Sequence, residues 1–119
     1  MENKSVAEKI KKDCMVLLNN KMIFNNQSVE AMDEYRQLYS HKQVLVVVTN
    51  EELISTAKLF LENNLNITQA SKKGYMHRNT LIYRIDKIKR LIGLDIRNFV
   101  EAVVFENLVM FYDTIKHHK

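Results

Sequence analysis

The stretch between Asn66 and Gly93 constrains the fold most, because two short helical patterns meet there at a tight corner. Asn66 is suited to cap the first helix, with Gln69 three residues later as its capping-box partner. Gly74 is expected to end that helix, because glycine accepts the left-handed conformation of a C-terminal cap. A second helix is expected to begin near His77 and to end at Gly93. Two helices joined by so short a turn predict a helix-turn-helix.

The second of these helices has one apolar face and a polar, basic remainder. Its apolar residues recur at steps of four, three and four, the spacing of one helix face: Leu81, Ile85, Ile88 and Ile92. Its other faces carry basic, amide and aromatic side chains: Arg78, Asn79, Tyr83, Arg84, Lys87 and Arg90. We therefore expect one buried face and a largely exposed basic surface.

A helix-turn-helix places the N-terminal residues of its second helix against base edges in the major groove of DNA. In this chain those residues are His77, Arg78, Asn79 and Thr80. Arginine suits guanine, asparagine suits adenine, and the threonine methyl group suits thymine. His77 has two roles open, a contact with DNA or a cap on the helix, and we favour the DNA contact.

Four basic side chains are candidates for phosphate contacts, which position a protein on DNA without specifying sequence. They are Lys72, Lys73, Arg84 and Lys87. Tyr83 lies off the apolar face, so its ring is expected against the sugar-phosphate backbone. The alternatives are packing of Tyr83 on the preceding helix and a surface ion pair of Arg84 with Asp86 or Asp95, which would contribute little.

The charge of the chain is concentrated on this unit. The formal net charge is +4, yet residues 68–97 hold eight basic and two acidic residues, and the rest holds ten basic and twelve acidic. Such a local excess is the electrostatic footprint of a protein that binds a polyanion. A basic helix that is merely solvated is the alternative.

The same residues resemble a known family, the C-terminal helix-turn-helix of PucR/CdaR-type bacterial regulators of purine and sugar-diacid catabolism. The resemblance covers about residues 50–112 and rests on His77-Arg78-Asn79-Thr80-Leu81, Tyr83-Arg84-Ile85 and Gly93-Leu94-Asp95. A more distant resemblance is to the helix-turn-helix of the factor for inversion stimulation.

The chain departs from the family pattern at three positions outside the proposed DNA-contacting residues. The family usually has leucine at Gly74, a small residue at Ser71 and threonine at Ile92. Family members usually carry this domain at the end of a longer chain with a sensing region. We therefore expect either a fragment of such a regulator or a short stand-alone one.

The rest of the chain predicts an all-α fold, with no proline and only two glycines. Residues 5–20 have the spacing of an amphipathic helix capped by Ser5, with Cys14 as a small buried hydrophobe. A break is expected over residues 19–28 and a second helix from near Ser28 to Tyr39. A helix from a Thr49 cap to about Asn63 is expected as the scaffold of the corner.

The run at residues 44–48, Val-Leu-Val-Val-Val, is ambiguous. A β-branched run of this length fits a short buried strand, an apolar helix or an extended connector, and we favour a non-helical conformation. We divide the chain into an N-terminal helical arm, residues 1–48, which is a candidate for dimerisation, and a helix-turn-helix domain, residues 49–119.

The last predicted helix, from about Phe99 to Lys116, follows an Asn98 cap and is apolar nearly all round. Exposed apolar surface of this extent usually marks an interface. A homodimer is therefore one expectation, and cover by the N-terminal helices of the same chain is the other, with equal weight.

Motifs of catalysis are missing from the sequence. It has no phosphate-binding glycine loop, no cysteine pair for a metal and no recognisable nucleophile with a base, so we expect no enzyme, no cofactor, no metal and no small-molecule site. The lone cysteine and the lack of a signal peptide or membrane-length apolar run favour the cytoplasm.

The sequence thus predicts a sequence-specific transcriptional regulator that binds double-stranded DNA as a homodimer, away from membranes. Two alternatives stay open. One is a nucleoid-type architectural DNA-binding protein with little sequence preference. The other is a helical protein-interaction module that does not bind DNA.

Overall fold

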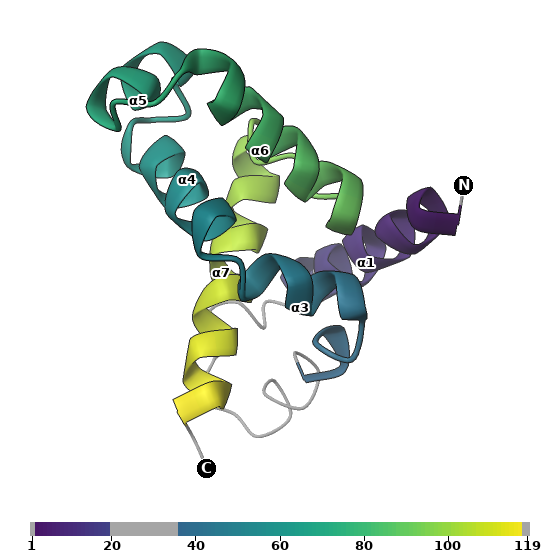
Figure 1. Ribbon diagram of the computed structural model, residues 1–119. Helices are drawn as coiled ribbons and strands as arrows, with labels where there is room; N and C mark the ends of the chain where they lie inside the picture. Colours follow the sequence, from purple (N-terminus) through teal and green to yellow (C-terminus); the bar gives the residue numbers. More distant parts are fainter. Residues whose placement is uncertain (1, 20–35, 118–119) are drawn as a thin grey trace.

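A computed structural model describes residues 2–19 and 36–117, with the side chains of residues 6–16 and 36–116. Over those ranges the chain is all-α, as predicted, and contains no strand (Figure 1). The helices are α1 (Glu2–Asn19), α3 (Lys42–Val48), α4 (Glu51–Glu62), α5 (Ile67–Lys73), α6 (Arg78–Ile92) and α7 (Phe99–His117). The break and second helix expected between residues 19 and 39 lie largely outside the described residues.

Helix α6 lies at the centre of the packing. It contacts α1, α3, α4 and α5, and α1 packs chiefly against it. The four residues predicted to form its apolar face are all fully buried: Leu81, Ile85, Ile88 and Ile92. One hydrophobic core joins them to Ile10 and Cys14 of α1, Phe60 of α4 and Phe105 of α7. The helix that carries the candidate site is therefore held from several sides.

The preference for a non-helical conformation at residues 44–48 was wrong. These residues form helix α3, in which Val44, Val47 and Val48 are buried at helical spacing while Leu45 and Val46 are 38% and 39% exposed. A β-branched run forms a strand only where another strand can pair with it, and the described chain offers none. Burial against α6 and α7 instead selects the helix.

Two of the four expected N-terminal caps are confirmed, and the starts of the other two helices differ. The Asn66 side chain accepts a hydrogen bond from the Gln69 backbone N–H at 2.9 Å, and Asn98 accepts one from Glu101 at 3.1 Å. Helix α4 is capped by Asn50 and not by Thr49, whose hydroxyl instead donates to a carbonyl of α3. Helix α1 begins at Glu2, one turn before the expected cap.

Helix α5 ends at the predicted place, but the glycine that follows it is not the left-handed residue of the corner. Gly74 follows the last residue of α5 but has φ −90°, and the left-handed residue is Tyr75 with φ 49°. A Cβ at position 74 would lie 2.3 Å from Cδ2 of Leu59, so a larger residue there would require the Leu59 side chain to move. Gly93 ends α6, as predicted, and it does so in the left-handed conformation with φ 80°.

Among the described residues, helix α7 has one buried side and one exposed side. Val104, Phe105, Leu108 and Phe111 are buried, whereas Phe99 is 71% exposed and Met110 is 52% exposed. Within residues 2–19 and 36–117, no helix combines the length and hydrophobicity needed to cross a membrane.

Candidate nucleic-acid interface

The first turn of α6 stands at the exposed end of the helix-turn-helix. The Nδ1 atom of His77 accepts a hydrogen bond from the Asn79 backbone N–H at 3.1 Å, so this ring caps α6. That is the structural role left open for His77 by the sequence, and the ring is still exposed to solvent. Arg78 and Asn79 are exposed beside it, and Thr80 is half-buried.

Arg78 is held at its outer end by the neighbouring helix. Its Nη1 donates to Oγ1 of Thr68 in the first turn of α5, at 3.0 Å. Both side chains are exposed. The N-terminal turns of α5 and α6 therefore meet, and the Arg78 guanidinium has a preferred orientation at the protein surface.

Two other basic residues of the positively charged stretch, residues 68–97, are paired with acidic neighbours. Arg97 bonds Asp86 at 2.8 Å and Asp95 at 2.9 Å, and Lys89 lies 3.8 Å from Asp95. Burial would raise the pKa of the Asp95 carboxyl, but hydrogen bonds from the side chain and backbone of Arg97 outweigh it and lower that pKa. This cluster joins the end of α6 to the loop that follows.

Arg84 is also engaged, though not with the acidic residues considered from the sequence. Its Nη2 donates to Oε2 of Glu52 at 2.7 Å, and its Nη1 donates to Oγ1 of Thr56 at 3.0 Å. Both partners belong to α4. The Arg84 side chain is 22% exposed, so most of it is withdrawn from solvent.

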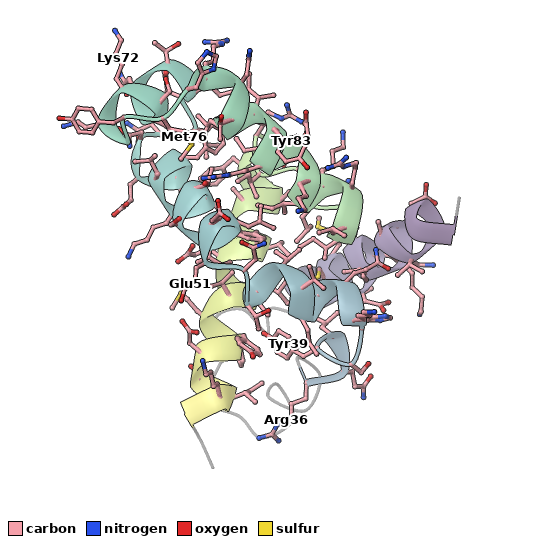
Figure 2. All side chains as sticks on the ribbon, viewed as in Figure 1. Arg36, Tyr39, Glu51, Lys72, Met76 and Tyr83 are labelled. Carbon is pink, nitrogen blue, oxygen red and sulfur yellow. The ribbon has the colours of Figure 1, made fainter. Side chains whose placement is uncertain are left out.

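Three lysines of the candidate set have no hydrogen bond or ion pair among the described residues: Lys72, Lys73 and Lys87. Lys72 and Lys73 are exposed in the last turn of α5, and Lys72 points away from the helices (Figure 2). Tyr83 is 56% exposed on the outer side of α6, and the guanidinium of Arg90 lies 5.6 Å from its ring centre. Lys72, Lys73 and Tyr83 are therefore accessible to a ligand from solvent, and Lys87 is half-buried.

Comparison with known proteins matches residues 53–106 to the PucR C-terminal helix-turn-helix domain. This range contains all but the first two residues of α4, all of α5 and α6, and the corner described above. Residues 53–106 belong to the PucR C-terminal helix-turn-helix family.

The relatives carry this PucR-type domain within longer proteins. The chain is 40% identical over 72 residues to the uncharacterized protein YxkF of Bacillus subtilis, which covers 60% of the chain and 24% of that protein. It is 28% identical to the purine catabolism regulatory protein of Bacillus subtilis, over 63% of the chain and 12% of the relative. It is 36% identical to the carbohydrate diacid regulator of Escherichia coli, over 46% of the chain and 14% of the relative. No solved structure matches the chain significantly.

The PucR-type domain is one of transcription regulators and not of enzymes. Its surface also contains residues that sequence analysis missed. Thr68, Glu52 and Thr56 hold two of the candidate arginines, but partners on separate helices leave no spacing signal in the sequence. Tyr75 is 98% exposed at the corner. Its position directly after Gly74 is the one signal that could have drawn attention to it.

Proposed function

We propose that the PucR-type domain of this chain binds double-stranded DNA sequence-specifically and regulates transcription. The observation that carries the proposal is the exposed first turn of α6, where Arg78 is oriented by Thr68 and Asn79 lies beside it. Arginine and asparagine are the side chains best suited to bidentate bonds with guanine and adenine. A protein with this role would work where the bacterial chromosome is, in the cytoplasm.

We assign the surrounding side chains to two groups. His77 and Thr80 flank the base-contacting pair and would touch bases or the adjacent phosphates. Lys72, Lys73, Lys87 and the Tyr83 ring would contact the sugar-phosphate backbone. Three lysines that each neutralise one phosphate would give a slope of log K against log salt of about −2.7 per bound protomer.

The test is fluorescence anisotropy on a labelled duplex from the region upstream of the gene and on a scrambled duplex, at several salt concentrations. Arg78→Ala should weaken binding to the native duplex by about 1–3 kcal/mol and reduce the preference for it. Lys87→Ala, the matched control on the same helix, should weaken binding to both duplexes alike and make the slope shallower by about 0.9.

Each alternative function corresponds to a different outcome. Equal and steeply salt-dependent binding to both duplexes would indicate an architectural or merely electrostatic DNA-binding protein. Folded protein that binds neither duplex would favour a helical interaction module. Equal losses on both duplexes for Arg78→Ala would contradict its role in base recognition.

We also propose that the DNA-binding form is a homodimer assembled through α7. Phe99, Val103, Glu106 and Met110 recur at steps of four, three and four on one face of this helix, which the rest of the described chain leaves largely open. Beside them a groove of about 620 Å³ lies between α7 and the end of α4, where it is lined by Lys58 and Glu62.

The N-terminal segment before residue 49 was the other expected dimerisation element. Its helix α1 packs against α6 within the same chain, so we assign the contact to α7 instead. A two-fold dimer would bind half-sites about 34 Å apart. Light scattering after size exclusion should give a dimer that Phe99→Ser converts to monomer, and a wild-type monomer at high protein concentration would refute the assignment.

A further inference from the structure

Arg84 occupies a position on α6 from which it reaches the neighbouring helix α4. Its two terminal nitrogens bond Glu52 at 2.7 Å and Thr56 at 3.0 Å. These partners lie four residues apart on α4, so they share one helix face and hold a single guanidinium between them. The sulfur of Met76, from the corner before α6, lies 4.0 Å from the same nitrogen as Thr56.

The burial of these groups distinguishes the contact from an ordinary surface ion pair. Thr56 is the one fully buried polar side chain among the residues whose side chains are described. Its hydroxyl needs a hydrogen-bond partner, because an unpaired buried polar group is unfavourable. Arg84 supplies that partner, and its own side chain is 22% exposed against 74% for Glu52.

We infer that Arg84 is a positioning residue that fixes α6 on α4, and not a phosphate ligand. The inference rests on the proposed DNA-binding function. Arg84 stands six residues after Arg78, which is about 9 Å along a helix axis. A tilt of about 5° at Arg84 would therefore move Arg78 by about 0.8 Å, and groups that bond a ligand specifically must be held to within about 0.5 Å.

The variant Glu52→Gln distinguishes a positioning role of Arg84 from a role as phosphate ligand. Glu51→Gln is its matched control. Both glutamates are exposed in the first turn of α4, and each change removes one negative charge. Of these two glutamates, only Glu52 has a described contact with Arg84. Both variants therefore change long-range attraction to DNA alike, and their difference reports the contact itself.

A positioning role predicts that Glu52→Gln has a preference for native over scrambled duplex about threefold lower than that of Glu51→Gln, with the same salt slope. If Arg84 is a phosphate ligand, releasing it from Glu52 would instead tighten binding to both duplexes and steepen the slope. That outcome would overturn the inference. An unchanged preference would overturn it as well.

A second pair of variants tests the buried contact. Thr56→Val keeps the shape of the side chain but removes the acceptor, so it should reduce the preference for the native duplex, whereas Thr56→Ser should retain it. Binding is measured well below the unfolding midpoint of each variant, so that a loss of stability alone leaves the preference unchanged. A wild-type protein without sequence preference would refute the proposed function itself, which separates that failure from failure of the inference.

Discussion

Tyr75→Gly should stabilise this protein, although it removes an aromatic side chain. Tyr75 has φ 49° and lies at the corner between α5 and α6. A left-handed conformation costs a residue other than glycine about 1–2 kcal/mol. The side chain is 98% exposed, so its removal loses almost no packing. The backbone penalty therefore dominates the effect of the substitution.

The expected magnitude follows from two opposing effects. Relief of the left-handed conformation favours the folded state by about 1–2 kcal/mol. The greater freedom of glycine in the unfolded chain opposes it by about 0.4–1 kcal/mol. We expect a net gain of about 0.5–1 kcal/mol, which for a chain of this size raises the Tm by about 2–4 °C.

The assay is urea and thermal unfolding followed by circular dichroism, with Gly74→Ala as the neighbouring control. Gly74→Ala should destabilise, because its new Cβ would lie 2.3 Å from Cδ2 of Leu59. That loss should shrink in a Leu59→Ala background, where the clashing atoms are absent. If the Tyr75→Gly variant is no more stable than wild type, the backbone penalty assigned to Tyr75 is refuted. If Gly74→Ala remains equally destabilising in the Leu59→Ala background, the assigned clash with Leu59 is refuted.

Three further predictions follow from buried and charged groups. Gly93→Ala should destabilise by about 1–3 kcal/mol in urea unfolding, since φ is +80° and a Cβ would lie 2.4 Å from the carbonyl oxygen of Ala7. Arg97 holds the pKa of Asp95 in the folded protein below its ordinary value of 3.8. The ionised Asp95 therefore stabilises the fold above pH 3.8, and this stabilisation is lost as the pH falls through the pKa that Asp95 has in the folded protein. Asp95→Asn should accordingly make the free energy of unfolding depend less steeply on pH in the acid range. Burial raises the pKa of the Cys14 thiol to about 12, so a thiol reagent should label Cys14 only after unfolding, and rapid labelling of the native protein would contradict its burial.

Local chemistry explains why much of the helix-turn-helix could be predicted. The Asn66 and Asn98 caps act on backbone N–H groups within three residues, and the four apolar residues of α6 repeat with the helix period. Whether these caps and this buried face form therefore depends on short stretches of sequence. The motif from His77 to Ile85 also indicated the family that the comparison confirmed over residues 53–106.

Other features depend on packing between distant segments. Residues 44–48 have a composition suited to a strand, and burial of Val44, Val47 and Val48 against other helices makes them helical. Gly74 has an ordinary φ of −90°, and the left-handed conformation at this corner falls on Tyr75 instead of the glycine.

By itself, the sequence determined the helices of the corner, the buried face of α6 and the family, because capping and periodicity act over a few residues. Only the tertiary structure decided which basic side chains are free. Arg84 is bonded to Glu52 and Thr56, whereas Lys72 and Lys87 have no described partner. Spacing along the chain cannot distinguish them, because the partners of a charged side chain are chosen by the helix that packs beside it.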